Sequence, residues 1–166
     1  MTFEEIKNIL IAGFGEIISA DEKGTQPSIT VPAEKIAEIC QFLFEDQRFY
    51  FDYLACITAI DNGPGLATME LIYNLNSIPY GHDVMLKIIF QRNTEDQPLP
   101  SVPTVSHIWR TADWHEREAF DLVGIHFENH PDLRRILLPE DWEGHPLRRD
   151  YEAQQKYHGI IVRSEN

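Results

Sequence analysis

Apolar residues recur at helical spacing close to the amino end of the chain. Thr2 and Glu5 form a capping-box pattern, in which each side chain accepts a hydrogen bond from the other residue's backbone amide. The apolar positions that follow are three or four residues apart and share one helical face: Phe3, Ile6 and Leu10. Gly13 and Gly15 indicate the end of this helix.

A second apolar stripe follows a short segment, 28–31, which predicts a strand. Pro32 suits the first position of a helix, because its missing amide would have no partner there in any case. The stripe repeats at i, i+3, i+4 and i+7: Ile36, Ile39, Cys40 and Leu43. The pattern predicts a second helix, with Cys40 as a small apolar core residue.

The middle of the chain changes to strand character. Three apolar segments, 53–60, 66–75 and 84–90, are separated by connections rich in glycine and proline. In the third segment, alternate residues point to one face: Val84, Leu86, Ile88 and Phe90. Because the connections are short, we expect these strands to be antiparallel neighbours.

A third helix is predicted after a proline-marked loop. Its apolar positions begin with Val105, Ile108, Trp109 and Ala112, and the helix runs to about Val123. These elements predict an α+β fold, in which a mixed or antiparallel sheet of about four strands is packed with helices on one side. Residues 1–123 would form the core domain.

Residues 124–166 lose this periodicity. The segment contains prolines, charges, histidines and aromatic residues, but it has no apolar face with which to fold alone. We interpret it as an extended tail that lies along a surface, its own or a partner's, and we expect it to stay mobile without a partner.

Composition narrows the classes of function. The chain carries 27 acidic residues against 14 Lys and Arg, a net charge of −13, which disfavours binding to nucleic acid or to an anionic membrane surface. Cys40 and Cys56 are isolated from one another, so they offer no ligand set for an iron–sulfur cluster or a cysteine-built zinc site. The amino end is acidic, unlike a signal peptide, and the longest nearly apolar run, 54–60, is far shorter than the ~20 residues that span a bilayer.

Several acidic residues of the third helix are candidates for chemistry. Glu116 falls on the apolar face, so it should point to the interior or to an interface and have an arginine or hydrogen-bond partners. We weigh two roles for it: a structural ion pair that closes the helix onto the tail, and a general acid or base with a raised pKa. Glu118 and Asp121 follow in the same helix.

Histidines in the region of His115 to His130 could indicate a metal-dependent enzyme. His115 and Glu116 do not continue as a HExxH helix, and His126 and His130 do not lie in a regular helix pattern. We favour histidines held by backbone or carboxylate groups. No glycine-rich nucleotide motif follows a strand.

Arginines of the tail are gathered in two adjacent pairs. Arg134 with Arg135 and Arg148 with Arg149 flank Trp142. One interpretation is a solvated loop whose arginines offset its own carboxylates. The other is an interface strip, since Arg and Trp are favoured interface anchors.

The run from Glu116 through Arg117, Glu118 and Asp121 to Ile125, continued from His130 through Arg134 and Arg135 to Leu137, resembles a known signature. It is similar to that of the C-type subunit of bacterial NADH:quinone oxidoreductase, the 30 kDa subunit family of respiratory complex I. Residues 139–151 extend the resemblance. Related membrane-bound hydrogenases and ferredoxin-dependent complexes carry similar subunits.

This resemblance implies a structural subunit of the peripheral arm that has no catalytic site of its own. FMN, iron–sulfur clusters and quinone would be bound by partner subunits, with no cofactor or metal on this chain. The implied partners are the quinone-binding subunit, of the D type, and the iron–sulfur subunits of the B and I types, with the tail on the quinone-binding subunit. The implied location is the cytoplasmic face of the bacterial inner membrane, and the length resembles a free-standing C-type subunit and not a fusion of the C and D types.

Overall fold

The computed structural model describes residues 1–22, 26–94 and 96–162, and the last four residues of the expected tail lie outside this range. The helices are α1 (Phe3–Phe14), α2 (Ile36–Glu45) and α3 (Arg110–Val123). The longer strands are β3 (Tyr53–Asp61), β4 (Thr68–Ser77) and β5 (His82–Gln91). The short strands are β1 (Ser19–Asp21), β2 (Ser28–Thr30), β6 (Ser101–Pro103), β7 (His126–Glu128), β8 (Lys156–Tyr157) and β9 (Ile160–Ile161).

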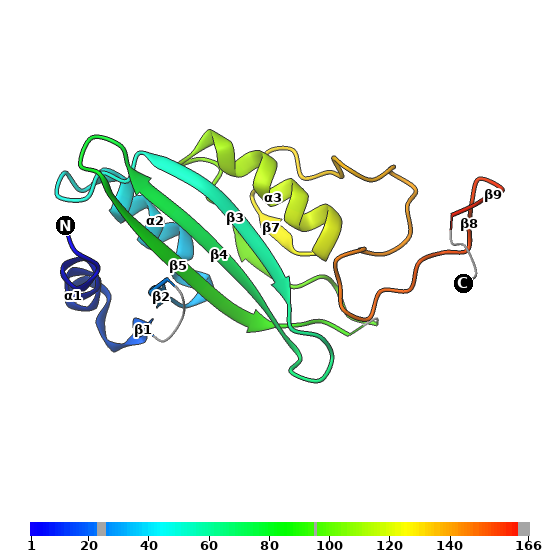
Figure 1. Ribbon diagram of the computed structural model, residues 1–166, viewed down its shortest axis with the longest axis horizontal. Coiled ribbons are helices and arrows are strands. Elements are labelled where there is room, and N and C mark those ends of the chain that lie inside the picture. The colour runs from blue at the N-terminus through cyan, green and yellow to red at the C-terminus, as the bar shows by residue number, and fades with distance from the viewer. Residues whose placement is uncertain (23–25, 95, 163–166) are drawn as a thin grey trace.

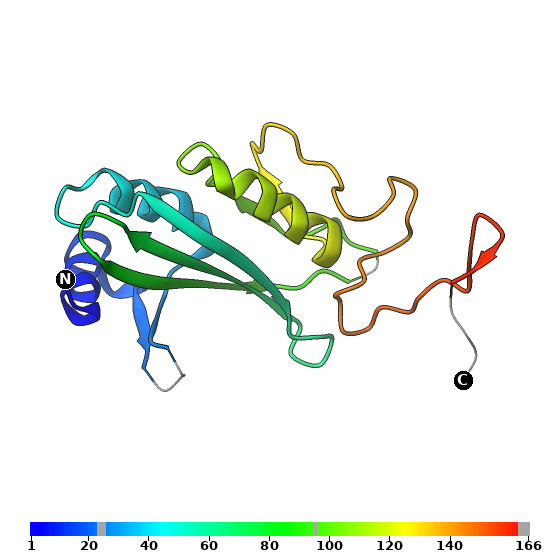
Figure 2. The same cartoon turned by 45° about the horizontal axis from the view of Figure 1, so that its top comes forward.

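The main sheet confirms the expected mixed α+β architecture. Within the described residues its strand order is β1-β2-β5-β4-β3, with β2 parallel to β5 and the other neighbouring pairs, β1 with β2, β5 with β4 and β4 with β3, antiparallel. Its fifth strand, β1, is too short to leave a periodic signal in the sequence. Figures 1 and 2 show α2 and α3 on the same side of this sheet.

The apolar stripes predict the core correctly. The side chains of the α2 stripe are all fully buried, and the inward-facing residues of β4 are buried as well. In β5, Val84, Leu86 and Ile88 are buried, whereas Phe90 is half-buried and packs against the core. The capping box of α1 forms as expected, with the Glu5 amide donating to the Thr2 hydroxyl and the Thr2 amide donating to the Glu5 carboxylate. Burying one face of the sheet under the helices is the main source of stability for such a fold.

Some element boundaries differ from the expectation. The third helix begins at Arg110 and not near Val105, because residues 105–108 form a tight turn in which the amides of Ile108 and Trp109 both donate to the Val105 carbonyl. The apolar residues of that turn still pack into the core, so the stripe extends beyond the helix itself. Pro32 precedes a short 3-10 turn, Ala33–Lys35, that leads into α2.

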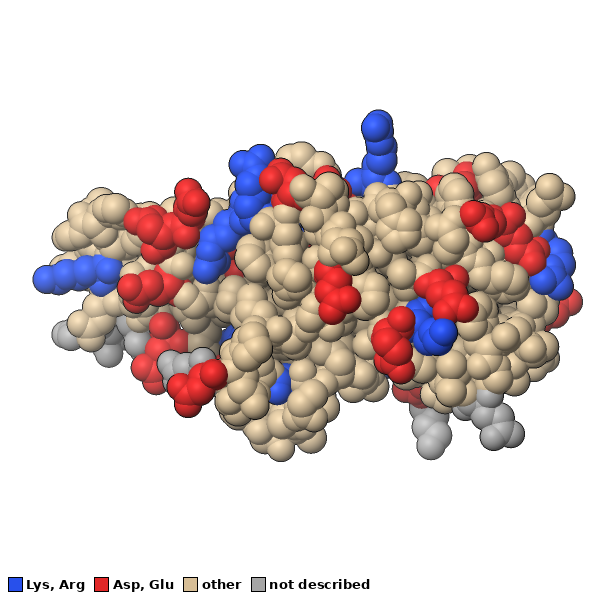
Figure 3. Space-filling view, turned by 180° about the vertical axis from the view of Figure 1, so that it is seen from behind, with Lys and Arg blue, Asp and Glu red and all other residues tan. Residues whose placement is uncertain are grey.

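The tail leaves α3 at Gly124 and runs away from the sheet. Its first strand, β7, pairs in parallel with β6, while the small β8–β9 hairpin lies far from the core (Figures 1 and 2). Between these strands, residues 129–155 are neither helix nor strand. Acidic side chains are spread over the face seen in Figure 3, with a few basic ones between them, in agreement with the net charge of −13. None of the described helices is both long and apolar enough to cross a bilayer.

The contacts of the tail predict where a protease enters it. Residues 135–150 make many hydrogen bonds to the core, whereas residues 152–162, within the described part of the chain, bond to the tail itself. In limited proteolysis of the isolated chain, the first cuts in the tail should therefore fall after residue 151, because cleavage requires local opening. Mass spectrometry of the fragments measures this. Early cuts within 130–150 would support instead a tail that is mobile as a whole without a partner.

Candidate functional site

Helix α3 is fixed at its start by hydrogen bonds to the edge of the sheet. The indole of Trp109 donates to the Phe51 carbonyl at 3.0 Å, and the Thr111 hydroxyl donates to the Leu54 carbonyl at 3.2 Å. These bonds and the buried apolar face set how α3 lies across β3. The end of the helix consequently lies where the tail and the ends of β3 and β5 meet.

The end of α3 and the tail form one site, which we call the junction. The last turn of an α-helix leaves carbonyl oxygens without partners in the helix. The tail supplies the donors here: His145 Nδ1 to the Asp121 carbonyl at 3.0 Å, the Leu147 amide to the Leu122 carbonyl at 2.9 Å, and Arg148 to the next two. Because the last turn of α3 has no basic residue of its own, the tail also brings the positive charge that the helix dipole favours there.

Arg148 has a central place in the junction. Its Nε donates to the Val123 carbonyl at 2.8 Å, while Nη2 donates to the Gly124 carbonyl at 3.1 Å and to Asn93 Oδ1 at 2.9 Å. Its acceptors thus lie on both the helix end and the segment after β5. Burial is the main cause of a lowered pKa for this guanidinium, which nevertheless stays charged at any physiological pH.

Asp121 of α3 binds the first part of the tail, and here the helix supplies the acceptor and the tail supplies the donors. Its fully buried carboxylate pairs with Arg135 Nη1 at 2.7 Å and accepts three consecutive backbone amides, from Ile136, Leu137 and Leu138, at 2.8–3.0 Å. Burial acts to raise the pKa of Asp121, but the amide and guanidinium donors outweigh it and the pKa is lowered. The other guanidinium nitrogen of Arg135 donates to two more tail carbonyls, those of Trp142 and Gly144.

A third contact ties the tail to the sheet. Asp61, at the end of β3, is buried and accepts from Arg92 Nε at 2.8 Å and from the Arg149 amide at 3.0 Å. Arg92 also pairs with Asp150 at 2.5 Å. Although burial opposes it, the pKa of Asp61 is lowered by the Arg149 and Arg92 donors. The sequence analysis did not identify Asp61, Arg92 and Asn93 as site residues. The pattern that could have indicated them is a polar residue at the end of an apolar strand, or directly after it.

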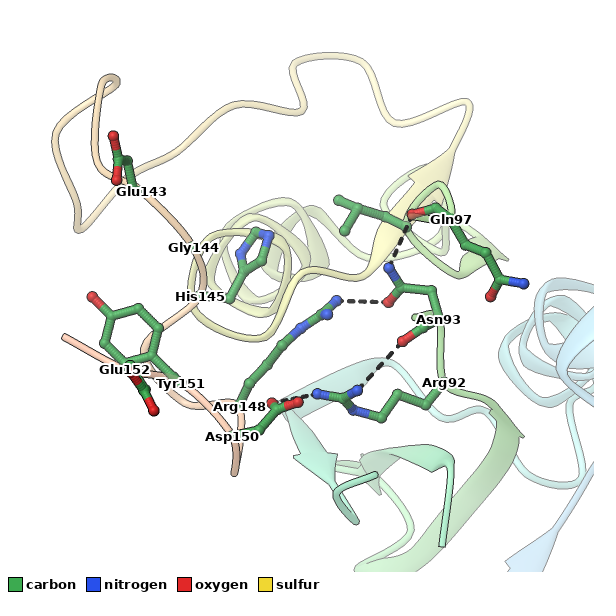
Figure 4. Close-up of a pocket in the computed structure, with 11 residues that line it drawn as sticks. Arg92, Asn93, Gln97, Glu143, Gly144, His145, Arg148, Asp150, Tyr151 and Glu152 are labelled. Atoms are coloured by element: carbon green, nitrogen blue, oxygen red, sulfur yellow. Dashed lines mark hydrogen bonds and ion pairs between the residues drawn. The ribbon is translucent and has the colours of Figure 1, made fainter. Parts of the chain in front are cut away.

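The tail and the segment after β5 line a pocket of about 610 Å³ that is open to solvent (Figure 4). Its walls include Arg92, Arg148 and Asp150, whose charged groups are occupied by one another and by the chain itself. Among the described residues no cluster of three His, Cys, Asp or Glu could hold a metal ion. The arrangement is suited to holding the tail in place.

Glu116 lies in the interior, as the apolar face predicted. It is fully buried, accepts the Val105 amide at 2.7 Å and bonds the Thr104 hydroxyl. Its partners are thus a backbone amide and a hydroxyl group and not an arginine, and the ion pair that closes the helix onto the tail is made by Asp121 with Arg135 instead. Burial raises the pKa of Glu116 to about 7.

Another group of predicted residues lies on the outer side of α3. The guanidinium of Arg117 stacks over Trp114 at 5.1 Å, and its Nε donates to the Arg134 carbonyl at 3.2 Å. Arg134 itself is exposed and pairs with the neighbouring Asp132, at 2.9 Å. Asp132 in turn donates its amide to His130.

The remaining predicted residues are dispersed. Glu118 is exposed beside the small cavity between α3 and β3. His130 is enclosed and hydrogen-bonds the Asp113 carbonyl at 3.2 Å. Trp142 donates to the Tyr151 hydroxyl at 3.1 Å and contacts the Tyr157 ring, so its indole packs within the tail.

The family model for the 30 kDa subunit of respiratory-chain NADH dehydrogenase matches residues 29–157, which include β3, β4, β5, α3 and the junction. The chain belongs to this family. A C-type subunit of NADH-quinone oxidoreductase from Chloroherpeton thalassium is 44% identical and covers 90% of the chain, which spans 60% of that relative. The corresponding subunit from Chlorobium phaeobacteroides is 42% identical, with 90% of this chain and 88% of that one covered.

A solved structure also has this fold. It is of the membrane-bound sulfane sulfur reductase, an archaeal respiratory membrane complex. One of its chains superposes with a TM-score of 0.72 at 26% identity, covering 90% of this chain and 85% of that chain. The fold therefore occurs in respiratory complexes of different kinds, which agrees with the resemblance to several complex types.

Gly124 tests how closely the junction is packed. Its φ of +74° disfavours any other residue, and an added Cβ would lie 2.5 Å from His145 and 2.8 Å from Arg148 Nη2. Gly124→Ala should cost about 1–3 kcal/mol from backbone strain alone and should also displace the tail. Urea unfolding measures the loss. Gly13→Ala is the matched control, because Gly13 lies in α1 with open space around it and should gain up to about 1 kcal/mol. Equal effects of the two substitutions would contradict this packing.

Asp121 tests the charge contacts of the junction. Asp121→Asn should lower the free energy of unfolding by about 3–5 kcal/mol near neutral pH, because Arg135 loses its buried counter-charge. Since the folded pKa of Asp121 is lowered, the stability it gives is present above the ordinary carboxyl pKa and is lost as pH falls through the folded value. Urea unfolding as a function of pH checks both points. The exposed Glu118→Gln is the control, and a matching unfolding curve for the two variants would exclude this role for Asp121.

Proposed function

We propose that the chain is a structural subunit of the peripheral arm of a proton-translocating NADH:quinone oxidoreductase, supporting electron transfer that neighbouring subunits carry out. The observation that carries the proposal is the family match over 29–157, a range that includes β3 to β5, α3 and the junction. The names of the relatives, C-type subunits of NADH-quinone oxidoreductase, agree with it.

The proposed chemistry of the chain is that of a scaffold with no cofactor of its own. Its two cysteines cannot provide the four thiolate ligands that an iron–sulfur cluster usually takes, and no nucleotide motif follows a strand. The charged side chains of the junction hold one another in place. FMN, clusters and quinone would therefore be bound by partners: the D-type subunit for quinone, and the B-type and I-type subunits for iron–sulfur clusters, at the cytoplasmic face of the membrane.

In each of the two arginine pairs, one residue would stabilise the tail and the other would bind a partner. Arg135 and Arg148 donate within this chain, to the Asp121 carboxylate and to the Val123 carbonyl. Each pair leaves one residue at the surface, Arg134 and Arg149. We infer that the inner arginines shape the tail and that the outer ones are available to the quinone-binding subunit. Guanidinium groups are suited to this role because they pair carboxylates bidentately and are weakly hydrated.

A second candidate is the equivalent subunit of a hydrogenase-type or ferredoxin-dependent complex. The structural likeness to a chain of an archaeal sulfane sulfur reductase supports this second candidate, because that complex is a respiratory membrane complex of another kind. Purification of the native complex through a tag on this chain separates the two. Flavin- and NADH-binding subunits in the preparation would support the first candidate, and nickel–iron subunits or a ferredoxin-linked module would support the second.

Assembly tests the proposed interface. A double variant, Arg134→Ala with Arg149→Ala, should unfold like the wild type in urea but assemble less complex and lower NADH:quinone reductase activity in membranes of a complemented deletion strain. Removing a desolvated interfacial charge typically costs about 2–5 kcal/mol, whereas a rim charge costs little. Native gels and activity assays measure the outcome.

The control for this experiment is Arg48→Ala. Arg48 forms a local pair with Asp46 two residues away, as Arg134 does with Asp132, but it lies before β3 and far from the tail in sequence. It should assemble normally. Wild-type assembly of the double variant would show that the outer arginines are solvated surface.

A further inference from the structure

A second buried polar cluster lies along α3, separate from the junction. It consists of Glu116 and Asp113 of α3, Thr104 and Ser106 of the turn before it, and His130 of the tail, and we call it the Glu116 cluster. The side chains of Glu116 and His130 have no exposed surface. A carboxylate in such a place loses the solvation of its charge and requires compensation from its surroundings.

The groups around Glu116 offer little compensation. On α3 itself the nearest titratable group is Asp113, α2 contributes the Cys40 thiol, and β4 contributes the Tyr73 phenol. Burial raises the pKa of both Cys40 and Tyr73, so these groups stay neutral. Within the described part of the chain no Lys or Arg pairs with Glu116, and the nearest basic atom is His130 Nε2, at 3.8 Å.

Two hydrogen bonds hold the His130 ring in one tautomer. Its Nδ1 accepts the Asp132 amide at 3.1 Å and therefore carries no proton, so Nε2 carries the proton and donates it to the Asp113 carbonyl at 3.2 Å. The imidazole thus connects the start of the tail to α3. Asp113 Oδ1 lies 3.6 Å from the same Nε2, is buried and has no hydrogen-bond partner among the described residues.

The hydrogen bonds of Glu116 suit a protonated carboxyl group. Oε1 accepts the Val105 amide, and a proton on Oε2 would be donated to Thr104 Oγ1. Thr104 Oγ1 would then accept this proton and the Ser106 amide, at 3.1 Å, and would donate to Ser106 Oγ at 2.8 Å. In this arrangement the Thr104 hydroxyl uses its one donor and both of its acceptor positions. Ser106 is only half-buried, so the two hydroxyls connect the carboxyl group with solvent.

We propose that Glu116 is a proton-binding site that holds its proton in the folded chain, and that its ionisation is sensed by His130 and loosens the start of the tail. On ionisation the Glu116 proton passes to solvent through Thr104 and Ser106. The carboxylate, 3.8 Å from Nε2, then competes with the Asp113 carbonyl for the Nε2 proton of His130. Turning the ring toward Glu116 moves Nδ1 and weakens the hydrogen bond that it accepts from the Asp132 amide.

The direction of the pH dependence follows from the raised pKa of Glu116. A folded pKa of about 7 against an ordinary value of 4.5 means that the stabilisation is complete below 4.5 and is lost as pH rises through 7. Between pH 5 and pH 8 this group alone should raise the unfolding equilibrium constant by roughly two orders of magnitude. Glu116→Gln, which resembles the neutral carboxyl, should remove this component.

The experiment uses the full chain as wild type, Glu116→Gln and the exposed control Glu118→Gln. Carbon-detected NMR of the glutamate carboxyl groups should show one group that titrates near neutral pH in the wild type and in Glu118→Gln, and is missing in Glu116→Gln. The His130 ring resonances should follow the same midpoint in the wild type and lose this inflection in Glu116→Gln. Amide hydrogen exchange at Asp132 should accelerate in the wild type as pH passes this midpoint, beyond the intrinsic effect of pH.

Three results would overturn the proposal. If every glutamate of the wild type titrated at an ordinary acidic pH, Glu116 would be ionised in the folded chain near neutral pH. This result is obtained from the wild type alone. Ring resonances of His130 that do not depend on Glu116 remove the coupling. Unchanged protection of the Asp132 amide through the midpoint removes the link to the tail.

Discussion

The tail satisfies the carbonyl oxygens at the end of α3, and the path of the tail depends on this constraint. A helix that ends inside a protein must find donors for its last carbonyl groups, since burying them without partners is costly. Gly124 ends α3 in the left-handed conformation and leaves no room for a side chain, so that His145 and Arg148 can approach the helix end. The helix and the tail therefore complete one another, although more than twenty residues separate them.

Three buried carboxyl groups show how surroundings decide charge. Asp121 and Asp61 each receive a guanidinium and backbone amides, and their pKa values are lowered in spite of burial. Glu116 receives one backbone amide, its second oxygen shares a hydrogen bond with a hydroxyl group, and burial raises its pKa. The difference lies in the number and charge of the donors, because each donor stabilises the ionised form. The first two act as permanent anchors, whereas the third is poised to gain or lose a proton.

The junction separates the rigid part of the tail from the part available to other molecules. Arginines that face the helix end are occupied, while the other residue in each pair lies at the surface. Adjacent arginines thus have opposite environments, because Arg135 and Arg148 reach acceptors on α3 whereas Arg134 and Arg149 are exposed. Holding the segment by its inner residues presents the outer ones to solvent in a fixed arrangement, which lowers the entropic cost of any contact that they make.

The sequence by itself determined the local elements and the core. The helical stripes, the alternating strands and the capping box identified α1, α2 and β3 to β5, because these patterns depend on neighbours close in the chain. The run from Glu116 to Tyr151 also identified the family. The partners of each charged residue depended on the tertiary structure. Asp61, Arg92 and Asp121 lie far apart in sequence, and only the path of the tail over the ends of β3, β5 and α3 brings them to Arg149, Asp150 and Arg135. Such contacts leave no periodic signal, since an irregular segment has no repeating face, and so the folded chain alone decides which arginines are anchors and which face solvent.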